Sequence, residues 1–546
     1  MAKISLIQFS SLEKVFLKAL PNQREYTNAT ALWGEEFSYQ IAYYADERLY
    51  AKIKIESDIQ NITVRRVGNV PSELPAFDNQ YDENYISTEP GLFPDVLYPV
   101  EDDEVALNRN YHSLWVTVPV DETVKAGKHS IKISLINEEF SISESRTMEL
   151  EIIPVALPGQ KLIHTQWFHA DCISSYYNVE VFSEKHWELI GKFIKTAVDN
   201  GINMILTPVF TPPLDTQICG ERPTVQLVGV VKNGEHYTFN FDKLKKWIDL
   251  CKKNGVKYYE ISHLFTQWGA NFTPKIIAVE NGIEKRIFGW DVEAVSAQYK
   301  SFLSQFLPKL TEFLKQEEIS RVTYFHISDE PHGEAHMRSY RAAKDMVYEY
   351  IKDFKIIDAL SDYQFYQTGL IKNPIPANNA IDIFLQNNVP DLWTYYCCSQ
   401  GIGVSNRFMA MPSYRNRIIA AQLYKFQIVG FLHWGYNFYY SQYSKNKINP
   451  FSVTDAGGGF PSGDPFVVYP YDDGPIESIR LKVFKEALQD LRAMELLERY
   501  MPKEKIIDLI EKEAGEPITF SHYPQSPKYV LGIREKINRK IAELDI

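Results

Sequence analysis

The chain has 546 residues, of which 45% are apolar and 23% are charged, as is ordinary for a globular protein. This length exceeds what one compact core usually holds, so we expect two or more domains. The formal net charge of −12 argues against nucleic acid or an anionic membrane surface as a partner, because both require a basic face on the protein.

The first 16 residues, MAKISLIQFSSLEKVF, lack the charged region, long apolar stretch and small-residue cleavage site of a secretory leader. No later stretch stays apolar for the roughly 18 residues of a membrane-spanning helix. Five scattered cysteines without a CxxC pair indicate neither a disulfide framework nor a zinc site. We therefore expect a cytoplasmic protein with reduced thiols, unless a leader has been trimmed.

The N-terminal part of the chain consists of short segments in which apolar and polar residues alternate. Alternation with a period of two, interrupted by polar turns, is typical of antiparallel strands and predicts a β-sandwich domain over residues 1–156. Prolines and a glycine at 154, 158 and 159 form the predicted linker. The clearest predicted strands cover 38–45, 61–67, 113–120, 129–136 and 147–155.

Between residues 160 and 500, predicted strands alternate with amphipathic helices. The helical stretches at 183–201 and 241–255 each end on a glycine, which suits a helix C-cap. The predicted strands cover 162–169, 203–210, 256–265, 321–328, 355–361, 381–386, 392–398 and 428–436. This α/β alternation predicts a (β/α)8 TIM-type barrel over residues 160–500. Helical spacing over residues 501–546 predicts a helical extension packed on the barrel.

The fourth predicted barrel strand runs into two adjacent carboxylates, Asp329 and Glu330, within YFHISDEPH (324–332). Two ionised carboxylates at a strand end need water, a metal or an active site. Catalytic groups of a TIM barrel follow the carboxyl ends of its strands, where this pair falls. The alternative is an acidic strand end before a helix, with Pro331 and Glu334 in the first helical turn.

Histidines near this pair raise the question of a metal site. His326 and His332 flank the two carboxylates, but HExxH spacing is missing and Pro331 interrupts the segment. We therefore expect no metal and no cofactor. We place His326 in the barrel wall or its hydrogen-bond network.

Two carboxylates at a barrel mouth suggest glycoside hydrolysis. In the usual retaining scheme the two carboxyl groups flank the anomeric carbon roughly 5 Å apart, which is awkward for adjacent residues. In a substrate-assisted scheme the 2-acetamido oxygen of the sugar is the nucleophile. One carboxylate then orients the acetamido N–H and the other acts as acid and base. The adjacency therefore predicts an N-acetylhexosamine substrate.

Several longer blocks resemble glycoside hydrolase family 123. They are TPVFTPPLDT (207–216), ERPTVQLV (221–228), HLFTQWGA (263–270), FGW (288–290), YFHISDEP (324–331), LWTYYCC (392–398) and GFLHWGYN (430–437). The resemblance covers residues 160–500, and the β-rich N-terminal part is similar in kind to the family's sandwich domain. It implies a retaining β-N-acetylgalactosaminidase with substrate assistance, Glu330 as general acid/base and Asp329 as the group that positions the acetamido.

The same resemblance implies residues that line the sugar pocket. They are His263, Trp268, Tyr395, Trp434 and Asn437. Strand parity places Trp434 and Tyr436 on one face of the last strand, so we add Tyr436 and favour Trp434. Barrel packing is the alternative for these aromatic residues.

Asp215 and Arg222 flank the Pro-rich loop after the second predicted strand. They are second-tier candidates for the site, and a surface salt bridge between them is the alternative.

The expected partner is a small oligosaccharide or glycan with a terminal β-linked N-acetylgalactosamine. Two alternatives stay open. One is a β-N-acetylglucosaminidase of the same mechanism, because motifs do not reveal which 4-hydroxyl orientation is bound. The other is a non-catalytic carbohydrate-binding relative, against which the intact Asp-Glu pair argues. Neither the natural aglycone nor the oligomeric state follows from the sequence.

Overall fold

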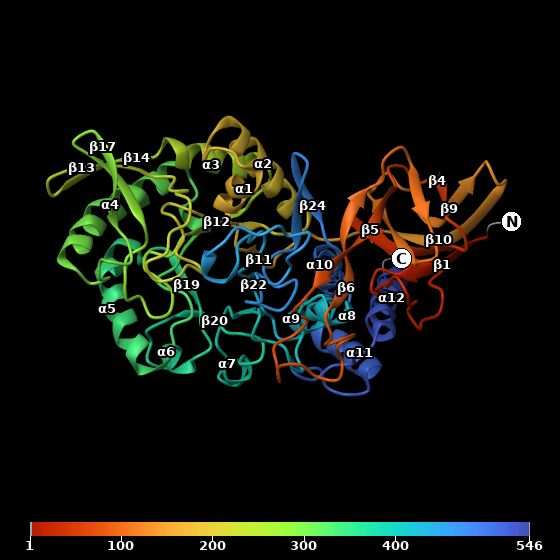
Figure 1. Ribbon diagram of the computed structural model, residues 1–546. Coiled ribbons are helices and arrows are strands. Elements are labelled where there is room, and N and C mark those ends of the chain that lie inside the picture. Colours follow the sequence, from red (N-terminus) through yellow and green to blue (C-terminus); the bar gives the residue numbers. More distant parts are fainter. Residues whose placement is uncertain (1–2, 545–546) are drawn as a thin grey trace.

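The N-terminal part of the protein contains two five-stranded β-sheets. The structure, a computed structural model, describes residues 3–544 (Figure 1). The first sheet has the order β1 (Ile4–Ser10), β3 (Glu35–Ala45), β8 (His112–Val120), β5 (Thr63–Ser72), β6 (Gly91–Pro99). The second has the order β2 (Asn28–Trp33), β10 (Ile142–Ala156), β9 (Gly127–Asn137), β4 (Leu49–Glu56), β7 (Glu104–Leu107). All neighbours are antiparallel except β2 and β10.

Alternating burial along these strands follows the sequence pattern. Tyr39 and Ile41 of β3 and Ile133 and Leu135 of β9 belong to one hydrophobic core that strands of both sheets share. The five predicted strands coincide with β3, β5, β8, β9 and β10. The other five strands, which are short or less regular in sequence, were not among them.

Eight parallel strands form a nearly closed barrel in the following part. In chain order they are β11 (Ile163–Gln166), β12 (Met204–Thr207), β15 (Tyr258–Ile261), β18 (Thr323–Phe325), β19 (Lys355–Ala359), β20 (Asn373–Ile375), β21 (Trp393–Tyr395) and β22 (Gly430–His433). From β12 to β20 each strand pairs with its predecessor in the chain, and β22 pairs with both β21 and β11. Between β20 and β21 only the bridge from Ala377 to Tyr395 remains.

The predicted sixth strand, 381–386, is wrong. These residues form helix α7 (Asp382–Gln386), in which Phe384 packs inward three residues after Ile381 while Ile383 is 44% exposed. Inward positions three apart are a helical spacing. The true sixth strand, β20, has three residues including Pro374, which is too short for a period to be read and contains a residue that is rare in strands. The other seven predictions each contain an observed strand.

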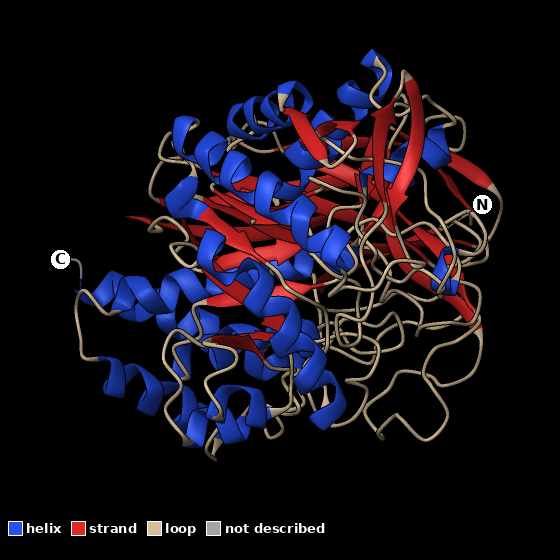
Figure 2. Ribbon diagram, turned by 90° about the vertical axis from the view of Figure 1, so that its left-hand side faces the viewer, coloured by secondary structure: helices blue, strands red, loops and turns tan. Residues whose placement is uncertain are grey.

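Helices cover the outside of the barrel strands (Figure 2). They are α1 (Ala170–Tyr177), α2 (Glu184–Asp199), α3 (Asp242–Lys253), α4 (Ala297–Gln316), α5 (Gly333–Ile351), α6 (Tyr363–Gln367), α7, α8 (Tyr414–Arg417), α9 (Ile419–Lys425) and α10 (Ile479–Leu497). The predicted helices at 183–201 and 241–255 correspond to α2 and α3. Gly201 and Gly255 follow them with φ of +82° and +88°, a left-handed backbone that glycine adopts without strain.

Further strands are inserted between the elements of the barrel. A four-stranded sheet consists of β13 (Gly229–Asn233), β14 (His236–Asn240), β16 (Ile276–Glu280) and β17 (Ile283–Phe288). A hairpin, β23 (Val468–Tyr471) and β24 (Gly474–Glu477), precedes α10. Two short 3-10 turns cover Ser320–Val322 and Gln442–Ser444.

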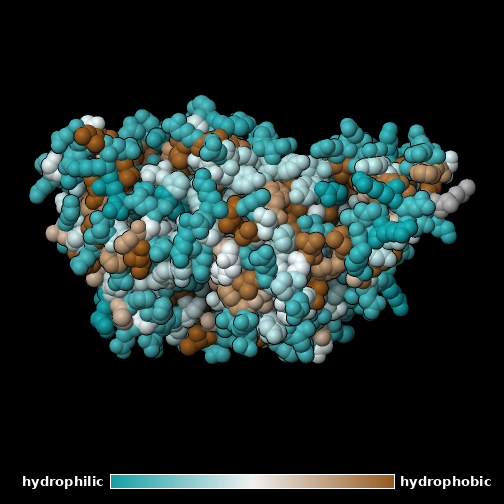
Figure 3. Space-filling view, in the orientation of Figure 1, coloured by the Kyte–Doolittle hydropathy of each residue, from teal (hydrophilic) through white to brown (hydrophobic). Residues whose placement is uncertain are grey.

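Two C-terminal helices, α11 (Lys503–Ala514) and α12 (Pro527–Leu544), complete the chain. Helix α12 packs against α10 and also against β2 and β10, so it joins the barrel side of the molecule to the N-terminal sheets. None of the helices within residues 3–544 is long and apolar enough to cross a membrane. On the face in Figure 3 the hydrophobic residues lie in small separate groups.

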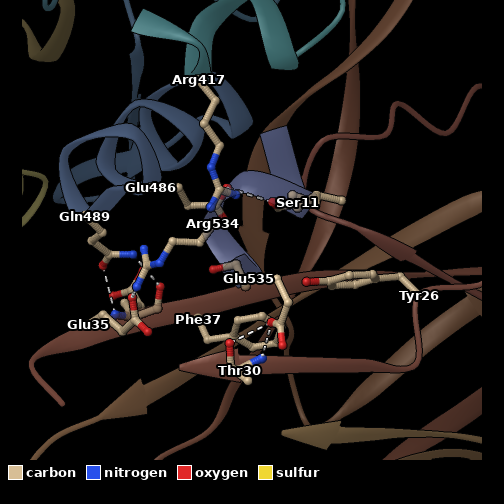
Figure 4. A pocket seen from close by; sticks show the side chains of 13 residues that line it. Ser11, Tyr26, Thr30, Glu35, Phe37, Arg417, Glu486, Gln489, Arg534 and Glu535 are labelled. Carbon is tan, nitrogen blue, oxygen red and sulfur yellow. Dashed lines mark hydrogen bonds and ion pairs between the residues drawn. The ribbon is translucent and has the colours of Figure 1, made fainter. Parts of the chain in front are cut away.

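A charged pocket lies where β3, α8, α10 and α12 meet (Figure 4). Arg417 donates to Glu486 at 2.6 Å and to Asp490 at 2.7 Å. Arg534 donates to Asp490 at 3.0 Å and also pairs with Glu35. Because these buried charges satisfy one another, we interpret this pocket as a structural junction.

Candidate active site

A second pocket opens at the carboxyl ends of the barrel strands. Its empty space, open solvent at the mouth included, is about 600 Å³. Residues at or just beyond the ends of β11, β12, β15, β18, β19, β21 and β22 line it. They are Trp167, Leu214, Asp215, Gln267, Trp268, Asp329, Glu330, Ala359, Tyr395, Cys397, Cys398, Leu432 and Trp434, with Phe460 from a later loop.

Asp329 and Glu330 both line this pocket although they are neighbours in the chain. Glu330 has a φ of +43°, a left-handed backbone that costs a residue other than glycine about 1–2 kcal/mol. Two backbone hydrogen bonds hold this turn: Glu330 N–H donates to the Ala359 carbonyl at 3.1 Å, and Trp268 N–H donates to the Asp329 carbonyl at 2.8 Å. The strained turn allows both carboxylates to face one ligand.

The two carboxylates have different surroundings. Glu330 Oε1 accepts a hydrogen bond of 2.8 Å from the Tyr395 hydroxyl. Burial and the neighbouring Glu330 raise the pKa of Tyr395 well above its ordinary value, so its hydroxyl keeps its proton. The Asp329 carboxylate accepts no hydrogen bond from any residue that the structure describes. Burial and the charge of Glu330 raise the pKa of Asp329 well above its ordinary value.

A buried histidine lies beneath this pair. His326 Nε2 is 2.5 Å from Glu260 Oε1, and its Nδ1 is 3.1 Å from Asp358 Oδ1. Burial lowers the pKa of His326, but the hydrogen bonds and charges of the two carboxylates outweigh it and raise that pKa to about 10. The imidazolium therefore ties β18 to β15 and β19, in the hydrogen-bond network where the sequence placed it.

Further donors complete this network, among them Thr165 Oγ1 to Glu260 and Ile327 N–H to Asp358. Trp167 Nε1 donates to Glu260 Oε1 at 2.8 Å, and the Tyr340 hydroxyl donates to Asp358 Oδ2 at 2.5 Å. Side chains from several elements thus meet at His326, Glu260 and Asp358, which are all buried. This arrangement fixes the backbone that leads into Asp329 and Glu330.

His263 lies below the pocket and does not line it. It is 1% exposed, and its ring stacks on His326 with centroids 4.3 Å apart. Neither ring nitrogen has a hydrogen-bond partner among the described residues, and burial holds its pKa well below the ordinary value. Ligand atoms of His263, His326 and Asp358 lie within 4.8 Å of one another. Both His326 nitrogens are already engaged by carboxylates, so this cluster is not an open metal site.

Two of the predicted tryptophans lie on the pocket wall. Trp434 Nε1 donates to Asp464 Oδ2 at 2.7 Å, which fixes the ring plane. Trp268 is 37% exposed at the rim, where Tyr443 meets it edge-on at a centroid distance of 6.4 Å. Aromatic faces of this kind suit the apolar face of a sugar ring.

Tyr436 and Asn437 are not brought to the pocket. Both are fully buried. The Tyr436 hydroxyl donates to the Phe193 carbonyl at 2.9 Å. The Asn437 side chain accepts from His169 N–H at 2.8 Å and donates to the His169 carbonyl at 3.1 Å. Because β22 ends at His433, strand parity holds for Leu432 and Trp434 but does not extend to Tyr436.

Asp215 and Arg222 do not form a salt bridge with each other. Asp215 lines the pocket, and its carboxylate accepts from Tyr443 N–H at 2.9 Å. Burial raises the pKa of Asp215 to about 6. Arg222 is buried and donates twice to Asp171, each time at 2.8 Å, so it supports the loop from inside.

Sequence reasoning missed several lining residues. Trp167 lies at the end of the first predicted strand and could have been found from that position. Cys397 and Cys398 lie in LWTYYCC, one of the blocks already singled out. Phe460 comes from a long loop without a periodic pattern, so no signal pointed to it.

Comparison with known proteins identifies one family. The sequence model of the glycoside hydrolase 123 catalytic domain matches residues 167–497. Among functionally curated proteins, none matches this chain.

The structure is similar to that of a family 123 glycoside hydrolase from Clostridium perfringens, which was analysed for glycolipid glycan hydrolysis. The TM-score is 0.73 at 16% identity, over 99% of this chain and 98% of the other. At this identity the likeness shows the fold alone. A Parabacteroides merdae β-glucuronidase (TM-score 0.32, 10% identity, 90% of this chain and 52% of the other) is too distant to carry an argument. The same holds for an Eisenbergiella tayi β-galacturonidase (TM-score 0.31, 10% identity, 90% and 73%).

Proposed function

Because the chain belongs to glycoside hydrolase family 123, we propose that it removes terminal β-linked N-acetylgalactosamine from glycans with retention of configuration. We propose that the 2-acetamido oxygen of the substrate is the nucleophile. The observation that carries this proposal is that Asp329 and Glu330, although adjacent, line one pocket with different surroundings. Two neighbouring side chains are poorly placed to flank one anomeric carbon from opposite sides, which favours the acetamido group of the substrate as the nucleophile.

Glu330 is the general acid and base in this proposal. Its proton passes to the glycosidic oxygen while the acetamido oxygen attacks the anomeric carbon and the glycosidic bond breaks. Glu330 then takes a proton from water, which attacks the anomeric carbon and releases the acetamido oxygen. Two inversions give net retention. The Tyr395 hydroxyl restrains one Glu330 oxygen, which leaves the other to face the substrate.

Asp329 orients the acetamido group. Its carboxylate has no protein donor, so it is free to accept the acetamido N–H. As the acetamido oxygen attacks, positive charge develops on the acetamido group, and a nearby carboxylate stabilises that charge. The raised pKa of Asp329 follows from burial beside Glu330, and a substrate that carries a developing positive charge offsets that cost.

Each predicted domain has a role in this proposal. We propose that the (β/α)8 barrel over residues 160–500 is the catalytic domain. The β-sandwich of residues 1–156 and the helical extension of residues 501–546 support it. The C. perfringens relative is described for glycolipid glycan hydrolysis, which favours glycans as the substrate class. A β-N-acetylglucosaminidase of the same mechanism is the second candidate, because the two sugars differ only in the orientation of the 4-hydroxyl.

A substrate panel tests this proposal. The p-nitrophenyl β-glycosides of N-acetylgalactosamine, N-acetylglucosamine and galactose differ only at the groups in question. We expect the first to be cleaved fastest and the galactoside not at all. Glu330→Gln should abolish turnover of substrates with poor leaving groups, whereas Glu334→Gln, an exposed acid four residues on, should not change it. Cleavage of the galactoside at a similar rate would refute the acetamido nucleophile.

A further inference from the structure

Two adjacent thiols lie in the wall of the candidate active site. Cys397 and Cys398 both line the pocket that contains Glu330 and Tyr395. Their Sγ atoms are 4.0 Å apart. Cys397 is buried and Cys398 is partly exposed, so the pair is reached from the pocket.

The turn that carries the pair is held firmly. Cys397 N–H donates to Gln400 Oε1 at 2.8 Å. The buried Asn406 side chain donates to the carbonyls of Cys397 and Gln400, each at 2.9 Å. The two sulfurs therefore stay together without the entropy loss that would accompany ordering a mobile loop.

The sulfur separation suits a shared soft centre. Two thiolates bound to one tetrahedral ion at about 2.3 Å lie roughly 3.8 Å apart, close to the separation seen here. A disulfide would instead require the sulfurs to approach to about 2.05 Å. Thiolate pairs select soft ions over the hard ions that carboxylates prefer.

We propose that Cys397 and Cys398 form a dithiol site for soft, thiophilic metal and metalloid centres, and that occupation of this site blocks the pocket. Capture by the thiols is independent of the proposed function. The loss of glycosidase activity on capture rests on it.

Phenylarsine oxide is a suitable probe, because trivalent arsenic binds two thiols at once. Two As–S bonds form and the As–O bond breaks. The two thiol protons leave with the oxygen as water, so nothing is oxidised or reduced. The hydrogen bond with Cys398, together with burial, raises the pKa of the Cys397 thiol, which slows alkylating reagents that need one free thiolate. Exchange at arsenic forms both bonds with loss of water.

Cys219 supplies the control, because it is the exposed thiol outside the pocket, whereas Cys172 and Cys251 are buried. The reduced full-length Cys219→Ser protein is treated with phenylarsine oxide after removal of the reductant. Intact-protein mass spectrometry should show the gain of one phenylarsenic unit and the loss of two hydrogens. Adding Cys398→Ser should weaken capture by about 100-fold or more, since the second As–S bond is intramolecular. Cys397→Ser is the companion variant, and thermal unfolding checks that both fold.

The possible outcomes distinguish a failure of the proposed dithiol site from a failure of the proposed glycosidase function. Failure of Cys219→Ser to take up arsenic, or equal uptake when both pocket cysteines are replaced, overturns the dithiol site. Uptake with full cleavage of p-nitrophenyl β-N-acetylgalactosaminide overturns the blocking of the pocket. If the untreated protein cleaves no hexosaminide, the proposed function fails while the mass result still decides the thiol site.

Discussion

The hydrogen bond between Tyr395 and Glu330 offers a sharp test of the active-site geometry. Tyr395→Phe removes one hydroxyl and leaves the ring in place. That hydroxyl donates to Glu330 Oε1 at 2.8 Å from a side chain that is 6% exposed. A hydrogen bond to a charged group contributes about 1.5–3 kcal/mol, and about 1.4 kcal/mol corresponds to a factor of ten. We therefore expect kcat/KM to fall by about 10- to 150-fold.

The neighbouring tyrosine is a matched control. The Tyr396 hydroxyl donates to Asn416 at 2.9 Å, a bond of nearly the same length to a neutral partner away from the pocket. Tyr396→Phe should cost about 1 kcal/mol of stability and leave the kinetics unchanged. Steady-state kinetics with a good and a poor leaving group should show a greater loss for the poor one in Tyr395→Phe. Equal kinetics for Tyr395→Phe and the native enzyme, or an equal loss in Tyr396→Phe, would refute the role of Tyr395.

Two further predictions concern buried charges. His326→Gln leaves Glu260 and Asp358 without their shared cation and should lower the free energy of unfolding by about 3–5 kcal/mol in urea. The pKa of His326 is about 10 in the folded protein, above its unfolded value, so its contribution to stability is full below pH 6.5 and is lost as the pH rises through 10. The native protein should therefore lose more stability than His326→Gln between pH 7 and 10. An equal or smaller loss would contradict this. Asp464, with a folded pKa of about 7 against 3.8 unfolded, should lower stability as the pH rises from 4 to 7, by at most about 1.4 kcal/mol per pH unit. Asp464→Asn should flatten that slope in urea unfolding at several pH values, and an unchanged slope would exclude Asp464 as its source.

Parts of the fold could be predicted from the sequence because the hydrophobic period and the length of the segments were clear. Seven barrel strands were found from apolar runs between helices. β20 was missed because its three residues, which include Pro374, are too few to show a hydrophobic period. Residues 381–386 were predicted as a strand because apolar and polar residues stand close together in IDIFLQ, which resembles the alternation of a strand. Burial of Ile381 and Phe384 three residues apart emerges only when the chain is folded.

Parts of the site were predictable for the same reason. Tyr395 ends β21, Trp434 follows β22 by one residue and Asp329 follows β18 by four, so all three lie on the side of the barrel where its topology places them. Tyr436 and Asn437 lie past the end of β22, where the chain turns and alternation no longer determines direction. The pairing of Arg222 with Asp171 joins segments about 50 residues apart, which local patterns do not reveal.

The central claim is that the acetamido group of the substrate is the nucleophile and that Asp329 orients it. Its most direct test is the rate of p-nitrophenyl β-glycosides whose N-acetyl group carries successive fluorine atoms, which weaken the acetamido oxygen as a nucleophile. We predict that kcat/KM falls steadily with each fluorine in the native enzyme and that Asp329→Asn lowers the rate for the parent substrate by about 100-fold or more. Rates that do not depend on fluorination would contradict the account.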